Sequence, residues 1–161
     1  MQDDTKIVAR GRDPEANFGI VNPPVYHAST IAFPDLATLE RRHELYVRYG
    51  RTGTPTTFAL QEAVAELEGG ANAVVTPSGL AAIAIALTSF LKAGDHLLMV
   101  DTVYEPGREF CDKVLTDLDI ETTYYDPLIG TDIEDLIRPT TRVVYVESPG
   151  SQTFEVQDIP A

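Results

Sequence analysis

The chain has 161 residues, of which 43% are hydrophobic and 23% charged. These proportions are typical of a soluble globular protein that is long enough to bury a core. The formal net charge of -13 at pH 7 argues against a nucleic-acid partner, because binding to a phosphate backbone needs clustered Lys and Arg. Any anion would have to be bound locally, by backbone N–H groups and a few placed arginines.

Cysteine and hydropathy patterns predict a cytoplasmic protein without a membrane partner. Cys111 is the single cysteine, which excludes an internal disulfide and is typical of a reducing compartment. Residues 1–12 are polar and do not resemble a signal peptide. The apolar run at residues 80–91 is too short to cross a bilayer. We predict no metal site, because the histidines lack the spacing of metal ligands; they are His27, His43 and His96.

The first part of the chain is expected to contain an ordered arm and two helices. Glycines and prolines interrupt residues 1–34, yet the stretch keeps enough apolar side chains to predict an arm lying on another surface. A helix is expected over residues 35–46, beginning near Asp35. A second should run from Pro55 to Gly69. Its expected buried stripe comprises Phe58, Leu60, Ala63, Val64 and Leu67.

The second part alternates strands with helices. We expect strands over residues 73–76, 96–100, 122–125 and 142–146. The intervening helices are predicted over residues 80–92, 106–118 and 132–137. The first of these helices is apolar nearly all round, so we expect burial on most sides and an end at Gly94. The second should bury Phe110, Val114 and Leu118.

This alternation predicts an α/β fold with a mostly parallel sheet and flanking helices. The carboxyl ends of parallel strands share one edge, where ligands of such folds bind. Polar or small residues follow three of the predicted strands, at residues 78–79, 101–104 and 147–151. The three turns are therefore expected to converge.

The turn at Ser78 and Gly79 is a candidate anion site. The free N–H groups and the dipole of a helix N-terminus attract a phosphate, and Gly79 has no side chain to obstruct it. The alternative is an ordinary N-cap at Ser78 and a tight turn at Gly79. Tyr104 offers a flat ring for stacking.

The loop at residues 47–55 is dense in Gly, Pro, Thr, Tyr and Arg, a composition common in functional loops. It could add the Tyr49 phenol and the Arg51 guanidinium, whose planar donor fork suits phosphate. A solvated connector is the alternative for this loop. With the turn at Ser78 and the ring of Tyr104, the set suits an aromatic, phosphorylated cofactor.

Five motifs, in order along nearly the whole chain, resemble the pyridoxal-phosphate enzymes of the cystathionine (trans-sulfuration) family. They are YGRTGTPT at residues 49–56, LEGG at 67–70, SGLAA at 78–82, DTVYEP at 101–106 and ESPGS at 147–151. Within that family, DPLIG at 126–130 and the tail from residue 147 are most similar to the bacterial cystathionine β-lyases. Relatives of the γ-lyase and γ-synthase type usually carry Thr-Asn-Pro at 150–152.

The resemblance implies the first part of the large domain of a fold-type I pyridoxal-phosphate enzyme. Residues 1–50 would form an arm and helix contacting a neighbouring subunit, and residues 51–161 would begin the cofactor-binding α/β domain. Ser78, Gly79 and Leu80 would bind the cofactor phosphate, and Tyr104 would stack on the pyridine ring. Tyr49 and Arg51 would reach a neighbouring subunit's cofactor, with Tyr49 also near the reacting amino group. A homo-oligomer with shared active sites, typically a tetramer, is implied.

The implied activity is β-elimination of cystathionine to homocysteine, pyruvate and ammonia, a step of methionine biosynthesis. The family also uses a lysine that binds the cofactor covalently and an aspartate beside the pyridine nitrogen, both placed beyond residue 161. None of Lys6, Lys92 and Lys113 matches that position. The chain is therefore expected to be truncated and inactive alone. A γ-lyase, γ-synthase or methionine γ-lyase relative and a non-catalytic truncated chain are the alternatives.

Overall fold

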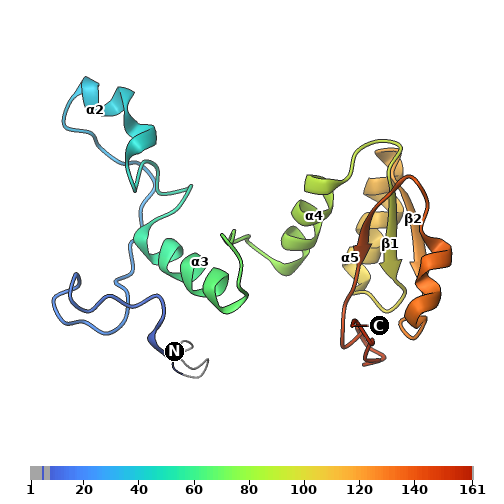
Figure 1. Ribbon diagram of the computed structural model, residues 1–161. Coiled ribbons are helices and arrows are strands. Elements are labelled where there is room, and N and C mark those ends of the chain that lie inside the picture. Colours follow the sequence, from blue (N-terminus) through green and yellow to red (C-terminus); the bar gives the residue numbers. More distant parts are fainter. Residues whose placement is uncertain (1–4, 6–7, 161) are drawn as a thin grey trace. The chain divides into compact units, whose positions relative to one another are not determined.

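The computed structural model describes Thr5 and residues 8–160. Residues 1–4, 6 and 7 of the predicted arm, among them Lys6, and the terminal Ala161 lie outside the described residues. The chain forms two compact units, Met1–Val75 and Thr76–Ala161, whose elements are labelled in Figure 1. The domain boundary predicted at residues 50 and 51 depends on contacts with another subunit and stays a prediction.

The predicted helix at residues 35–46 is wrong in length. It divides into α2 (Leu36–Glu40) and a single 3₁₀ turn, η1 (Arg42–Glu44). The carboxylate of Asp35 caps α2 as predicted and accepts the Thr38 N–H at 2.7 Å. Neither element contains a buried residue. A partial apolar face that buries nothing cannot stabilise a longer helix.

Helix α3 (Pro55–Leu67) confirms the second predicted helix. Pro55 occupies its first turn, and the Thr54 N–H donates to Thr57 Oγ1 at 2.7 Å in a reciprocal cap. The predicted buried stripe is wrong, since only Ala65 is buried in α3. Leu60, Val64 and Leu67 are 53%, 41% and 45% exposed. Among the described residues, no other helix or strand packs extensively against that face.

The arm is ordered against α3 of its own unit. Thr56 Oγ1 accepts the Tyr26 N–H at 2.8 Å and donates to the Pro24 carbonyl at 2.7 Å. Arg10 forms an ion pair with Glu66 at 2.5 Å. The prediction of an ordered segment is confirmed for these residues, and its contact with a neighbouring subunit stays a prediction.

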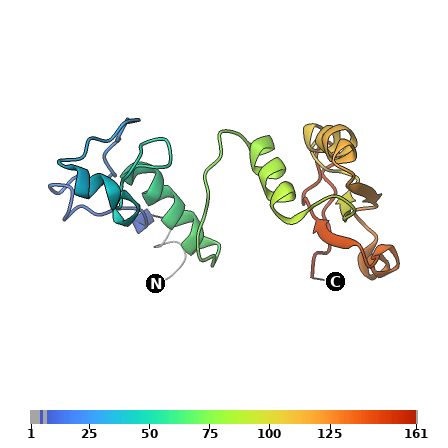
Figure 2. The ribbon, with the colours of Figure 1, turned by 90° about the horizontal axis from the view of Figure 1, so that it is seen from above.

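The second unit confirms the predicted α/β fold class. In chain order its elements are α4 (Gly79–Phe90), β1 (His96–Val100), α5 (Glu105–Glu109), the π-helical η2 (Phe110–Leu115), β2 (Glu121–Tyr125), the 3₁₀ segment η3 (Gly130–Leu136) and β3 (Thr141–Tyr145). The strands form a parallel sheet in the order β2-β1-β3, seen from two directions in Figures 1 and 2. The predicted strand at residues 73–76 is wrong: within the described chain no strand pairs with it.

Strand β1 is the centre of the core, because all five of its residues are buried. Side chains from four other elements or turns pack around it, including Leu87, Cys111, Leu115, Ile120 and Tyr125. A central parallel strand is covered on both faces, which explains its continuous apolar run after His96.

The buried face of the helix after β1 differs from the prediction. Gly107, Cys111 and Leu115 are buried, whereas Val114 and Leu118 are 44% and 50% exposed. Phe110 is partly buried against the core. A Cβ at position 107 would stand 3.5 Å from Val103 and 3.6 Å from Ile83, which are ordinary contact distances, so this buried face packs against both side chains without requiring a glycine.

The predicted burial of the apolar helix is also wrong. Helix α4 ends at Phe90, and Leu87 is its only buried residue. Ile85 and Phe90 remain 50% and 73% exposed, because the described elements of the unit cover one side of α4. Gly94 does not end the helix but lies in the turn before β1, with φ +85°.

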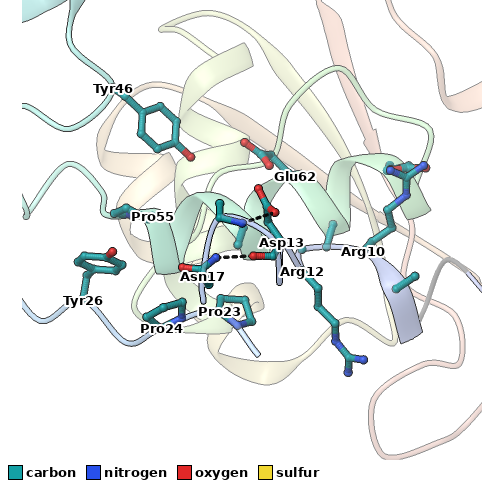
Figure 3. Close-up of a pocket in the computed structure, with 16 residues that line it drawn as sticks. Arg10, Arg12, Asp13, Asn17, Pro23, Pro24, Tyr26, Tyr46, Pro55 and Glu62 are labelled. Atoms are coloured by element: carbon teal, nitrogen blue, oxygen red, sulfur yellow. Dashed lines mark hydrogen bonds and ion pairs between the residues drawn. The ribbon is translucent and has the colours of Figure 1, made fainter. Parts of the chain in front are cut away.

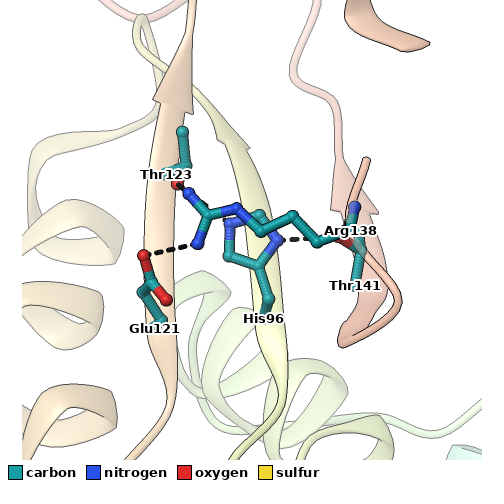
Figure 4. A network of polar contacts seen from close by, with 5 residues as sticks. All are labelled: His96, Glu121, Thr123, Arg138 and Thr141. Atoms are coloured by element: carbon teal, nitrogen blue, oxygen red, sulfur yellow. Dashed lines mark hydrogen bonds and ion pairs between the residues drawn. The ribbon is translucent and has the colours of Figure 1, made fainter. Parts of the chain in front are cut away.

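A buried histidine joins all three strands at their amino ends. His96, which is 1% exposed, contacts Thr141 Oγ1 through Nδ1 at 2.7 Å and Thr123 Oγ1 through Nε2 at 2.9 Å. Arg138 crosses this cluster and forms an ion pair with Glu121 at 2.6 Å (Figure 4). Burial and the Arg138 charge lower the pKa of His96 below its ordinary value of 6.5. The neutral imidazole donates from one nitrogen and accepts at the other, which matches two hydroxyl partners.

The lowered pKa of His96 predicts that the free energy of unfolding decreases in acid. Because the unfolded chain binds the His96 proton more readily, this contribution to the free energy of unfolding is complete above about pH 6.5 and is lost as the pH falls through the folded pKa. His96→Gln should flatten that pH dependence in denaturant titrations between about pH 7.5 and pH 5. The control is His43→Gln at an exposed site, which should retain the wild-type slope. Equal slopes for wild type and His96→Gln would contradict the assignment.

Candidate functional site

Hydrogen bonds connect the loops that follow the three strands at the carboxyl edge of the sheet. The Asp101 N–H donates to the Tyr125 carbonyl at 2.8 Å, joining the loop after β1 to the end of β2. The Ser151 N–H donates to the Thr102 carbonyl at 2.7 Å. The Tyr104 N–H donates to Glu147 Oε1 at 3.0 Å. Two of the three predicted turns, 101–104 and 147–151, therefore lie together.

Helix α4 begins with two free backbone donors. Ser78 Oγ accepts the Ala81 N–H at 3.1 Å, so Ser78 is the N-cap that the sequence allowed. The N–H groups of Gly79 and Leu80 lie in the first turn, where no intrahelical partner exists, and no partner occurs among the described residues. A Cβ at Gly79 would meet nothing within 4 Å. The N-cap and the two unpartnered donors thus occur in one turn, and anion binding there stays a prediction.

Tyr104 immediately precedes α5, and its side chain is not enclosed. The residue is 46% exposed and has the backbone angles φ -48° and ψ 123°. Helix α5 contacts α4 at Gly107 and Ile83. The aromatic residue and the open helix N-terminus therefore belong to adjoining helices of the same unit.

Arg108 organises the other side of this edge and was not predicted. Its guanidinium pairs with the Asp101 carboxylate, donates to the Asp101 carbonyl at 2.7 Å and lies 3.8 Å from the ring centroid of Tyr124. The Tyr124 hydroxyl donates to Asp112 at 2.6 Å. Burial and that carboxylate raise the pKa of Tyr124. No sequence spacing signals this cluster, because its members come from a turn, a helix and a strand.

An open hollow of about 690 Å³ lies along the same edge. Its lining includes Asp101, Thr102, Arg108, Tyr124, Asp126 and Ser151. Polar groups from the segments after all three strands thus face one space, although none of Ser78, Gly79, Leu80 and Tyr104 lines it.

Tyr49 and Arg51 belong to the first unit, in an exposed turn. The Thr52 N–H and Oγ1 donate to the Tyr49 carbonyl at 3.0 and 2.8 Å and fix that turn. Gly50 is required there, since a Cβ would stand 2.2 Å from the Ala28 carbonyl oxygen. The approach of Tyr49 and Arg51 to a cofactor stays a prediction.

The first unit has its own hollow, of about 590 Å³. Figure 3 shows Arg10, Arg12, Tyr26, Tyr46 and Glu62 around it, with Asp13 closing a turn by accepting the Ala16 N–H at 3.0 Å. None of the predicted site residues lines this hollow.

Comparison with known proteins identifies the family of this chain. The family model described as "Cys/Met metabolism PLP-dependent enzyme" matches residues 4–161. The chain belongs to this family. Its members use pyridoxal phosphate, so the resemblance drawn from the sequence motifs is confirmed.

Several relatives match nearly the whole chain. A putative cystathionine beta-lyase of Rhizobium johnstonii is 52% identical over 98% of this chain and 39% of its own length. Cystathionine beta-lyase MetC of Escherichia coli is 46% identical over 98% of the chain and 41% of its own length. An L-alanine/L-glutamate racemase of Wolbachia pipientis is 38% identical over 99% and 42%. The chain spans about two fifths of the length of these relatives.

Crystal structures in the family share the fold. MetB from Corynebacterium glutamicum has a TM-score of 0.88 at 28% identity, covering 99% of this chain and 40% of its own. Cystathionine gamma-lyase from Lactobacillus plantarum, in complex with L-serine, has a TM-score of 0.86 at 30% identity with the same coverage. The α/β fold and its place in the family are therefore shown.

The second unit fits the family's cofactor. The N–H groups of Gly79 and Leu80 have no partner among the described residues, and a Cβ at Gly79 would meet nothing within 4 Å. These donors suit a phosphate, and an exposed aromatic ring on the adjoining helix suits a pyridine.

In the described part of the chain, no helix combines the length and apolar character needed to cross a membrane. No group of three or more potential metal-ligating side chains occurs there either.

Gly150 is predicted to be essential for the packing of the edge loops. A Cβ at this buried position would stand 2.5 Å from Thr102 Oγ1 and 2.6 Å from Thr102 Cβ. Gly150→Ala should lower the free energy of unfolding by about 1–3 kcal/mol, measured by denaturant titration, because overpacking forces the backbone to shift. Ser151→Ala keeps the backbone bond to Thr102 and should change stability by less than about 0.5 kcal/mol. A Gly150→Ala protein as stable as wild type would disprove this contact.

Proposed function

We propose that this chain is the first part of a pyridoxal-phosphate-dependent carbon-sulfur lyase that cleaves cystathionine by β-elimination. The observation that carries the proposal is the sequence similarity to cystathionine beta-lyases, 52% and 46% identity across 98% of the chain. The free donors at the start of α4 and the exposed Tyr104 support it. The activity belongs to a polypeptide of the relatives' length.

Each residue has a defined task in this proposal. Gly79 and Leu80 bind the cofactor phosphate through backbone N–H groups, and Ser78 fixes that turn through its bond to the Ala81 N–H. Tyr104 stacks on the pyridine ring. The cofactor supplies an electron sink for the α-carbon of the substrate, so that the β-thiolate leaves.

The neighbouring subunit completes the proposed site. Tyr49 and Arg51 lie in a rigid, exposed turn of the first unit. We propose that they reach the cofactor phosphate of a second copy, with Tyr49 near the reacting amino group, in a cytoplasmic homo-oligomer with shared active sites. The covalent lysine, which none of Lys6, Lys92 and Lys113 matches, would lie in the rest of the polypeptide.

A γ-elimination activity is the second candidate. The structural similarity to cystathionine gamma-lyase of Lactobacillus plantarum favours it, with a TM-score of 0.86. The residues at 150–152, Gly-Ser-Gln, depart from the Thr-Asn-Pro usual in γ-lyases and favour the β-lyase. A non-catalytic truncated chain is the third candidate.

The products distinguish these functions. The complete polypeptide encoded by the gene, loaded with pyridoxal phosphate, should release pyruvate, homocysteine and ammonia from cystathionine. The 161-residue chain alone should release none of them. Release of 2-oxobutyrate and cysteine would support γ-elimination instead, and an inactive complete protein that binds no cofactor would contradict the proposal.

The substitution Gly79→Ala should weaken cofactor binding without lowering the stability of the fold. The new Cβ meets nothing in the structure, and Ala is favoured over Gly in a helix by up to about 1 kcal/mol. The cofactor-free protein should therefore be at least as stable as wild type. Its Kd for pyridoxal phosphate, measured by equilibrium titration of the complete protein, should rise about tenfold, because the methyl group enters the space proposed for the phosphate. An unchanged Kd would place the phosphate elsewhere.

A further inference from the structure

We infer that Glu147 is a positioning residue that fixes Tyr104 for stacking on the cofactor ring. The inference rests on the proposed function, which places Tyr104 against that ring. Glu147 follows the end of β3, and its Oε1 accepts the Tyr104 N–H at 3.0 Å. Its side chain thus links the end of one strand to the aromatic residue that follows another.

The hydrogen bond between the Tyr104 N–H and Glu147 matters because few other contacts hold the Tyr104 side chain in place. Tyr104 is 46% exposed, and its side chain makes no hydrogen bond within the described residues. The direction in which the ring leaves the chain is therefore set by the backbone at Tyr104. A bond from an N–H to a carboxylate is among the stronger hydrogen bonds in proteins.

Glu147 is itself fixed by neighbours. The Gln157 side-chain amide donates to the Glu147 carbonyl at 2.7 Å. The Tyr145 hydroxyl lies 3.5 Å from Glu147 Oε2, and burial followed by the Glu147 charge raises the pKa of Tyr145, which keeps this hydroxyl a donor. The Tyr125 hydroxyl donates to the Tyr145 carbonyl at 2.9 Å. These bonds hold the backbone on either side of the Glu147 side chain, and the Tyr145 hydroxyl lies beside its carboxylate.

Glu147 lies in the sequence motif ESPGS at residues 147–151. The structure assigns the residue a physical task within the site, since its carboxylate accepts a hydrogen bond from the backbone of Tyr104. The same loop donates the Ser151 N–H to the Thr102 carbonyl at 2.7 Å. Two bonds from one loop thus fix both ends of the short turn from Thr102 to Tyr104.

A double-mutant cycle in the complete, cofactor-loaded protein tests the inference. Glu147→Ala should raise the Kd for pyridoxal phosphate about tenfold and reduce the visible circular dichroism of the bound cofactor, because the stacked ring loses its fixed orientation. In a Tyr104→Ala background, Glu147→Ala should add less than about a twofold change, since the residue that it positions is gone. Glu147→Gln keeps an acceptor oxygen and should restore a Kd within about threefold of wild type.

A purely structural role predicts a different pattern. It would lower the melting temperature of the cofactor-free protein and give independent, additive effects on Kd with Tyr104→Ala. Additive effects, or a Glu147→Ala protein with the wild-type Kd and circular dichroism, would overturn the inference. If Glu147→Ala does not fold, Glu147→Met, which has a similar length and no acceptor oxygen, takes its place.

Two comparisons complete the design. Glu155→Ala removes a carboxylate from the same segment whose side chain makes no polar contact among the described residues, so the Kd should remain at the wild-type value. A wild-type protein that binds no pyridoxal phosphate would overturn the proposed function and this inference with it. A wild-type protein that binds normally, together with an unaffected Glu147→Ala variant, would overturn only the positioning role.

Discussion

Burial of β1 between two parallel neighbours is the constraint on which the rest of the second unit depends. All five residues of β1 are buried, and the strand lies in the centre of the sheet, parallel to both β2 and β3. That pairing places the carboxyl ends of the three strands at one edge. Glu147, after β3, can then reach the backbone of Tyr104, after β1, although 43 positions separate them.

The two ends of the sheet are stabilised differently. At the amino ends, the buried His96 and two threonine hydroxyls join the strands, and the exposed Arg138–Glu121 ion pair lies across them. At the carboxyl ends, backbone N–H groups, the Glu147 carboxylate and the Arg108 guanidinium join the loops. The first arrangement surrounds a buried imidazole, whereas the second leaves Tyr104 46% exposed and polar side chains around an open hollow.

Local patterns in the sequence predicted most of the elements and the chemistry of the helix terminus. Asp35 caps a helix, Pro55 begins one, and Ser78 caps another, because these signals act over a few residues. Parallel strands followed from apolar runs alternating with helices. The Arg108 cluster and the Glu147 bond could not be predicted, since they join residues from separate elements and depend on the register of β1 against its neighbours.

Burial was predicted less well than secondary structure, for a physical reason. The apolar faces of α3 and α4 indicated enclosure, yet Val64, Ile85 and Phe90 remain exposed in their units. An apolar pattern indicates that a helix face can be buried. Whether it is buried depends on other segments of the protein packing against it. For the helix after β1, the core covers Gly107, Cys111 and Leu115 and leaves the apolar Val114 and Leu118 exposed.

A crystal structure of the complete protein with pyridoxal phosphate tests the central claim most directly. The account predicts phosphate oxygens within about 3 Å of the backbone nitrogens of Gly79 and Leu80, with the pyridine ring stacked on Tyr104. A phosphate bound away from the start of α4, or a pyridine ring that does not contact Tyr104, would contradict it.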